Sequence, residues 1–193
     1  KTTPTGTGSA SITATYDAQD RRTTYGNSTY AYNAAGDLTS KTSTQGTTQY
    51  SYDALGNLRN VTLPNNTTIT YLIDGQNRRV GKEVNGTLQY GLLYQKSLNP
   101  VAETDGSGNV IERFVYGDKP NVPAYLIKGG TTYRIVSDYQ GSVREVVNAS
   151  TGQIVQQLTY SPFGQVTQDT APGFQPFGYA GGLYDPDTSL DRF

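Results

Sequence analysis

The sequence predicts an all-β protein, a repetitive array of antiparallel hairpins, and three observations support this. Turn-forming residues recur about every ten positions through the first half of the chain. The runs between them are rich in Thr, Tyr, Val, Ile and Leu, and the spacing leaves about six residues per run, the common length of a β-strand. No segment carries a helical period over about ten residues. The recurring turn residues are Gly26, Gly36, Gly46, Gly56, Asn66, Gly75 and Gly86.

Two kinds of turn alternate, which makes the structural repeat about twenty residues long. One kind is a loop with Asp or Asn first and Gly fourth, as in Asn33–Gly36 and Asp53–Gly56. The other is a tight pair, and Asn85-Gly86 is typical of a type I′ hairpin turn, which requires positive φ at both residues. Where the loop recurs at Asp74, Asn77 takes the glycine position, because Asn is the next-best residue in left-handed backbone. Stacked units of this kind are expected to form a wall or scaffold.

The tyrosines of the repeat are expected to lie on one face of the sheet. Tyr30 and Tyr32 are two residues apart, and Tyr50 and Tyr52 repeat this spacing twenty residues later. Residues two apart in a strand share a face, so these rings should form a stripe, continued by Tyr71 and Tyr90. Packing within the repeat is the favoured role of the stripe, and sugar binding is the alternative.

Composition excludes several classes of function. The 193 residues carry a net charge of -1 without a basic block, which argues against nucleic acid and anionic membranes as partners. Cys and His are absent, so disulfides, thiolate or imidazole metal sites and a Ser-His-Asp triad are excluded. No apolar run has the length of a membrane span, so membrane insertion is not expected. Without Met or an apolar N-terminal segment, the chain reads as an internal fragment or processed product.

Three regions are expected along the chain. Residues 1–15 are rich in Thr, Gly and Ser and are predicted to be a flexible lead-in. Residues 16–120 form the hairpin array, and residues 121–193 form a further β segment with less regular hairpins. Pro120 and Pro123 mark the soft boundary between them.

Carboxylates are the remaining candidates for chemistry. The run from Asp105 to Asn109 superficially resembles a calcium loop, but its glycines are misplaced for an EF-hand, and a hairpin turn is favoured. Asp185, Asp187 and Asp191 could pair for acid–base work, although aspartates beside a Pro-containing turn are more often turn caps. Neither a metal nor a cofactor is expected.

Several motifs resemble the YD repeats of bacterial rearrangement-hotspot (RHS) proteins. The segment from Tyr52 to Leu58 is the best match, with similar segments at Tyr32–Leu38 and Tyr16–Arg22. Later segments, including Phe177–Gly182, resemble the approach to the RHS core and its opening. The repeat signature falls on Asp17, Asn33, Gly36, Asp53, Gly56 and Asp74. The core-like motif falls on Asp138, Gly141, Ser142, Arg144, Pro162, Phe163, Gly164, Tyr184, Asp185 and Pro186.

The resemblance implies a β-ribbon that spirals into a hollow shell around a polymorphic toxin or other effector, secreted or at a bacterial cell surface. It also implies that self-cleavage depends on aspartates of a later motif, beyond Phe193, so no catalytic residue is assigned to this chain. Two positions depart from the family pattern. Tyr139 stands where His is frequent, and Ser189 stands where Gly is usual, which is expected to strain a turn.

Three functions follow from these observations. The favoured one is a non-enzymatic section of a shell wall whose partners are the rest of the shell, or copies of itself, and an enclosed effector. The second is an extracellular adhesion module that binds glycans through Tyr30, Tyr32, Tyr50, Tyr52 and Tyr71. The third is an enzyme that uses carboxylates or Tyr, such as a glycosidase. A lone piece of wall would expose sheet edges, so self-association is expected.

Overall fold

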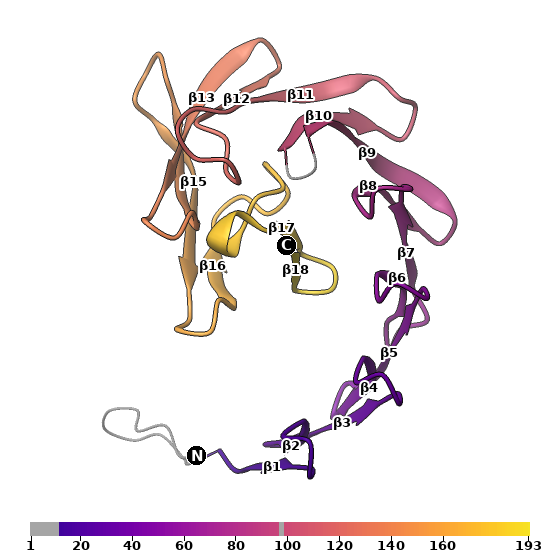
Figure 1. The fold of residues 1–193 in the computed structure, drawn as a ribbon. Coiled ribbons are helices and arrows are strands. Elements are labelled where there is room, and N and C mark those ends of the chain that lie inside the picture. Colours follow the sequence, from indigo (N-terminus) through magenta and orange to yellow (C-terminus); the bar gives the residue numbers. More distant parts are fainter. Residues whose placement is uncertain (1–11, 97–98) are drawn as a thin grey trace. The chain divides into compact units, whose positions relative to one another are not determined.

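The computed structural model describes residues 12–96 and 99–193, and these form an all-β structure (Figure 1). Within them, a 16-stranded sheet runs in strict chain order from β1 to β16, and β17 and β18 form a separate two-stranded sheet. A single 3₁₀ turn, η1, interrupts the described β structure at Tyr179–Gly181. The predicted hairpin array is therefore confirmed.

The strands of the first half are β1 (Ala14–Tyr16), β2 (Arg22–Tyr25), β3 (Ser28–Tyr32), β4 (Leu38–Ser43), β5 (Gly46–Tyr52), β6 (Leu58–Thr62), β7 (Thr68–Ile73), β8 (Arg79–Val84) and β9 (Thr87–Lys96). Those of the second half are β10 (Asn99–Asp105), β11 (Val110–Val115), β12 (Tyr125–Lys128), β13 (Thr131–Ser137), β14 (Val143–Asn148), β15 (Ile154–Tyr160), β16 (Val166–Asp169), β17 (Leu183–Asp185) and β18 (Leu190–Arg192). β1 begins inside the predicted lead-in, whose residues 1–11 lie outside the described part of the chain.

The chain divides into two compact units. The first comprises Lys1–Ile73 and Glu83–Thr87, and the second comprises Asp74–Lys82 and Leu88–Phe193. The predicted soft boundary at Pro120 and Pro123 falls within the second unit, between β11 and β12, which pair with each other. That boundary stays a prediction.

In the first unit, the alternation of side chains across the sheet places one face in a small core. Val61, Ile69 and Tyr71 are fully buried, and Tyr50 and Leu58 pack against them. Strand β5 alternates strictly between half-buried and exposed positions along its length. This period of two is what a sheet with one wet face requires, so Thr, Ser and Gln occupy the exposed positions.

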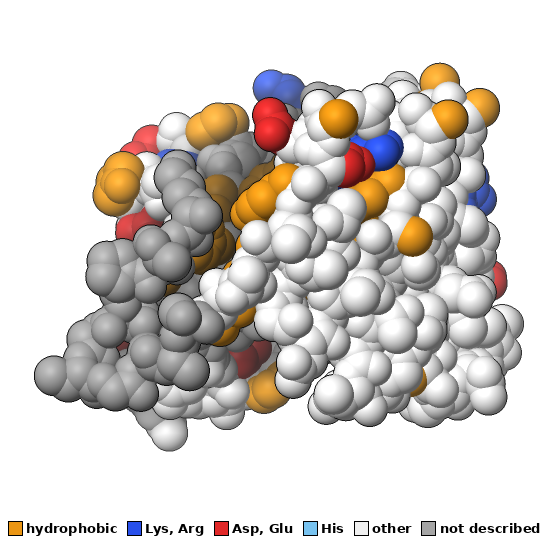
Figure 2. Space-filling view, turned by 90° about the horizontal axis from the view of Figure 1, so that it is seen from below, with side chains coloured by type: hydrophobic (Ala, Val, Ile, Leu, Met, Phe, Trp, Pro, Cys, Tyr) orange, Lys and Arg blue, Asp and Glu red, His pale blue; other side chains and the backbone are white. Residues whose placement is uncertain are grey.

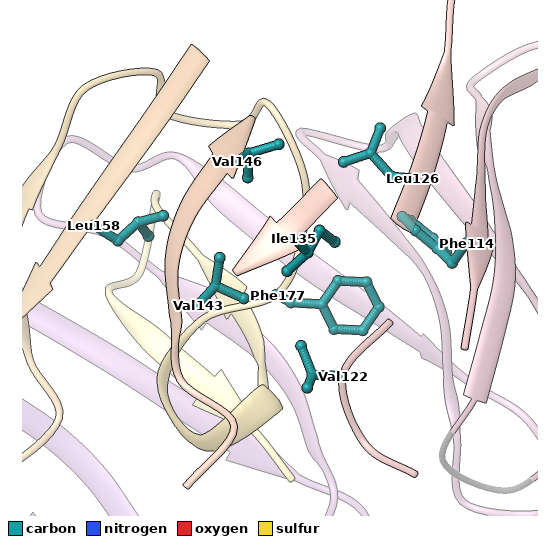
Figure 3. Packing of buried hydrophobic residues seen from close by; sticks show 8 residues of the cluster. All are labelled: Phe114, Val122, Leu126, Ile135, Val143, Val146, Leu158 and Phe177. Atoms are coloured by element: carbon teal, nitrogen blue, oxygen red, sulfur yellow. The ribbon is translucent and has the colours of Figure 1, made fainter. Parts of the chain in front are cut away.

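The second unit holds the larger core, and the C-terminal segment contributes to it (Figure 3). Phe177 is 2% exposed and meets the ring of Phe114 edge to face, with centroids 5.0 Å apart. Leu126, Ile135 and Val146 come from successive strands of the sheet and surround this pair. After β16 the chain no longer adds strands to the large sheet. Its C-terminal segment instead packs against the sheet of the same unit through Phe177.

Charged side chains are sparse on the surface. Only 16% of the residues are Asp, Glu, Lys or Arg, and Figure 2 shows a face on which backbone and uncharged polar side chains predominate.

Candidate functional site

The aspartates of the repeat signature organise a recurring loop through backbone hydrogen bonds. In each copy one carboxylate oxygen accepts the backbone N–H groups of the residues two and four positions further along, at 2.9–3.0 Å. The backbone N–H of the same aspartate donates to the carbonyl four residues on, which closes the loop. The copies begin at Asp17, Asp53, Asp74, Asp105 and Asp138. Asn33 and Ser161 begin related loops, in which Asn33 Oδ1 accepts Asp37 N–H at 2.9 Å.

The fourth loop position is left-handed, as the Gly pattern predicts. Gly36 has a φ of 94° and Gly56 a φ of 79°, and Asn77 occupies the same position with a φ of 61°. The expectation that Asn77 replaces the glycine is therefore confirmed. Ser189, where the resemblance implies Gly, also has a left-handed φ of 56°.

The loop carboxylates are held in their ionised form. The side-chain hydrogen bond from Arg78 lowers the pKa of Asp74, and the Asn57 backbone N–H lowers the pKa of Asp53. Asp105 has the same arrangement with Asn109, so the segment suspected of resembling a calcium loop is the hairpin turn between β10 and β11. These side chains cap turns, as the pattern indicated.

The predicted tyrosine stripe lies on one face of the first unit. Tyr30 on β3 lies opposite Lys41 on β4, and Lys41 lies opposite Thr48 on β5. Opposed residues share a face of the sheet, and Tyr50 is two residues after Thr48, so Tyr30 and Tyr50 lie on the same face. Tyr30, Tyr32, Tyr50 and Tyr52 are half-buried. The ring pairs of the described residues lie elsewhere than at Tyr30, Tyr32, Tyr50 and Tyr52. Arginines cover these rings instead: Arg22 lies 4.5 Å from the Tyr30 centroid and Arg21 lies 5.2 Å from that of Tyr32.

Tyr71 does not belong to an exposed binding surface. Its ring is fully buried in the core of the first unit, so the prediction that it contacts a ligand directly does not fit its position. Tyr50 and Tyr52 instead line an open groove of about 480 Å³ with Asp37 and Asp53. Glycan binding by this groove stays a prediction.

The core-like motifs, distant in sequence, meet at η1. Ser142 is fully buried, and its Oγ accepts the backbone N–H of Ala180 at 3.0 Å. Val143 N–H donates to the Gly178 carbonyl at 3.2 Å.

Gly164 lies against the Tyr179 ring so closely that an added Cβ would stand 2.7 Å from it. Asp138 accepts both Arg144 Nε and Nη2, at 3.0 and 2.9 Å. Pro162, Phe163 and Pro186 are exposed turn residues beside these contacts.

A buried ion cluster joins β8 to the C-terminal hairpin, and the sequence did not predict its lysine. Lys82 Nζ lies 2.6 Å from Asp185 Oδ1 and 2.6 Å from Asp187 Oδ2. The side chains of Lys82 and Asp185 are 6% and 1% exposed. Asp185 Oδ1 also accepts the Asp187 backbone N–H at 3.0 Å, the predicted turn cap. Burial raises the pKa of Asp191, the third predicted carboxylate, to about 6.

A second, partly buried cluster contains two carboxyls that directly oppose each other. Glu103 on β10 pairs with Glu112 on β11, and Glu112 pairs with Lys128 on β12. Lys128 Nζ lies 3.2 Å from Glu112 Oε2 and donates to the Phe174 carbonyl at 2.6 Å. Burial and the Glu112 charge raise the pKa of Glu103 to about 7. Glu112 occupies a buried position of β11, whereas Glu103 is a half-buried residue between the buried Ala102 and Thr104.

A cavity of about 230 Å³ in the second unit lies beside the C-terminal hairpin. Arg78, Arg79 and Arg192 line it together with Tyr94 and Phe193. In the described part of the chain, no three Asp, Glu, His or Cys side chains gather in a way that would hold a metal ion. The described residues also contain no helix long and apolar enough to cross a membrane.

Consecutive antiparallel hairpins closed by Asp-led loops define the class of YD-repeat β-sheet proteins. Residues 3–193 match the family described as Teneurin YD-shell, and the chain belongs to that family. The predicted relationship to YD-repeat and RHS proteins is thereby confirmed.

Individual relatives match short parts of much longer proteins. Teneurin-1 of Gallus gallus is 32% identical over 127 residues, which is 64% of this chain and 5% of teneurin-1. The tRNA3(Ser)-specific nuclease WapA of Bacillus spizizenii is 29% identical over 124 residues, 63% of this chain and 5% of WapA. The crystal structure of TcdB2-TccC3-TEV has a TM-score of 0.50 at 18% identity and covers 95% of this chain and 13% of that one. At this identity the likeness concerns the fold alone.

Proposed function

We propose that this chain is a non-enzymatic section of a β-shell wall that encloses or presents a polymorphic toxin or effector. The observation that carries the proposal is the uninterrupted strand order from β1 to β16, in which every strand pairs with the next along the chain. A wall needs such continuity, because each strand supplies the hydrogen-bonding edge for its successor. Membership of the YD-shell family supports the same role.

The buried polar groups also support a structural role. The loop aspartates accept hydrogen bonds from backbone N–H groups, as Asp53 does. Lys82 on β8 and Asp185 on β17 form an ion pair inside the second unit. A catalytic carboxylate would need access to substrate. We place the wall in a secreted or cell-surface protein, whose partners are the remaining shell and the enclosed effector.

The test uses the protein together with the effector segment that it is proposed to enclose. Phe177→Ala removes a fully packed ring of the second unit and should cost about 3–5 kcal/mol. We expect protease to digest the enclosed segment rapidly in this variant and slowly in the wild type. Phe163→Ala is the matched control, since that ring is 84% exposed. It should leave the protection unchanged.

Two outcomes would contradict the proposal. If the effector segment within the wild-type protein is digested as fast as the same segment in isolation, the wall encloses nothing and the proposal fails. If both Phe variants lose protection equally, protection does not depend on the wall built by the second unit.

A further inference from the structure

The lysine–carboxylate cluster at β8 and β17 has the arrangement needed for a covalent bond between side chains. Its amine and carboxyl are both almost fully buried, and Nζ lies 2.6 Å from Asp185 Oδ1. The carbon that would be attacked, Cγ, is bonded to that oxygen. Groups held at this separation react as an intramolecular pair, which avoids the entropic cost of a bimolecular encounter.

A second carboxylate stands at the same nitrogen. Asp187 Oδ2 is also 2.6 Å from Lys82 Nζ, and the Asp187 side chain is 54% exposed. It is therefore in contact with the amine on one side and with solvent on the other. Such a group can accept a proton from the ammonium and return it later, as a general base and acid.

Burial favours the neutral product over the ion pair. An ion pair removed from water bears a desolvation cost that an amide does not. Tyr90 is half-buried in the same region, and desolvation raises the pKa of its hydroxyl while the charges of Arg79 and Asp185 act on it. Exclusion of water from the carboxyl also protects an amide from hydrolysis.

We infer that Lys82 and Asp185 form an intramolecular isopeptide bond, with Asp187 as the proton carrier. Asp187 takes a proton from the Lys82 ammonium and passes it to the Asp185 carboxylate, and the resulting neutral amine attacks Cγ of the now protonated Asp185 carboxyl. The N–Cγ bond forms, and one Cγ–O bond breaks. The second proton that the nitrogen loses goes through Asp187 to the departing hydroxyl, which leaves as water, and Asp187 is again a carboxylate. An ammonium and a carboxylate thus become one amide and one water, with no co-reactant.

The bond would lock the C-terminal hairpin to the sheet of the second unit. Lys82 and Asp185 are 103 residues apart in sequence, so the amide closes a long loop of chain. A cross-link of this kind stabilises mainly by restricting the unfolded chain, as a disulfide does. The chain has no cysteine, so a disulfide cannot serve this purpose.

Intact mass under denaturing conditions tests the inference on the 193-residue chain. The wild type should be lighter than its sequence by one water, and digestion should yield a branched peptide containing Lys82 and Asp185. Lys82→Arg keeps the positive charge but cannot form the amide, so it should restore the full mass. Lys128→Arg is the matched control, because Lys128 also pairs with a buried carboxyl, at 3.2 Å, and it should keep the mass deficit.

Asp187→Asn tests the proton carrier separately. This variant should accumulate the lighter species more slowly than the wild type in freshly folded protein. A wild type that folds, by circular dichroism, and keeps its full mass after prolonged incubation at neutral pH overturns the inference and leaves an ordinary ion pair. A mass deficit that persists in Lys82→Arg overturns the assignment of the residues.

Discussion

At the residue scale, backbone conformation decides which turn positions tolerate substitution. Gly86 has a φ of 77°, and an added Cβ would meet nothing within 4 Å. Gly75 has equally open surroundings but no left-handed φ. Because neither position would give a clash, the two glycines isolate the cost of backbone strain.

We predict that Gly86→Ala destabilises the chain by about 1 kcal/mol, because an L-residue in left-handed backbone is strained. Gly75→Ala should be neutral or stabilise slightly, because it only restricts the unfolded chain. Urea denaturation of both variants measures the difference. Equal effects at the two positions would contradict the assignment of strain to positive φ.

At the element scale, a carboxyl in the hairpin of β10 and β11 makes the free energy of unfolding depend on pH. Glu103 lies directly opposite Glu112, and burial together with the Glu112 charge raises its pKa from 4.5 to about 7. Lys128 is the cation that faces the pair. The folded state therefore holds a proton between about pH 4.5 and 7 that the unfolded state releases.

The free energy of unfolding should consequently fall as pH rises through this window. The contribution of Glu103 is fully present below its unfolded pKa and is lost through about pH 7, a change of about 3 kcal/mol. Glu103→Gln should flatten this decline in thermal or urea unfolding measured from pH 5 to about 8. Glu145→Gln, on β14, should leave the decline in place because Glu103 remains. A steep decline in Glu103→Gln would assign the effect to other groups.

At the scale of the whole molecule, the sheet order leaves two terminal strands. Among the described residues, β1 and β16 each pair with a single neighbouring strand of the sheet. An unpaired strand edge is a template for another chain, so we expect the isolated 193-residue chain to self-associate with rising concentration.

A charge on the edge should oppose this association. Gln168→Lys places a charge at an exposed position of β16, and light scattering should show weaker association than in the wild type. Gln49→Lys adds the same charge at an exposed position of β5, an interior strand, and should leave association unchanged. A wild type that stays monomeric at high concentration would contradict the expectation.

The sequence by itself determined the strands, the alternation of turns and the left-handed positions. These features are local: Asp53 and Gly56 build their loop from contacts within five residues, so the pattern of residue types suffices. The family resemblance was also readable, because it depends on those same loops.

Only the tertiary structure decided which residues far apart in sequence meet. It buried Tyr71 in the core, although the sequence placed it with the half-exposed tyrosines. It brought Lys82 to Asp185, and the Glu103 pair to Lys128 and Phe174. The sheet order follows from local hairpins, but the return of the C-terminal segment depends on which apolar face is left uncovered. That choice is made by packing around Phe177, where no local pattern specifies the partner.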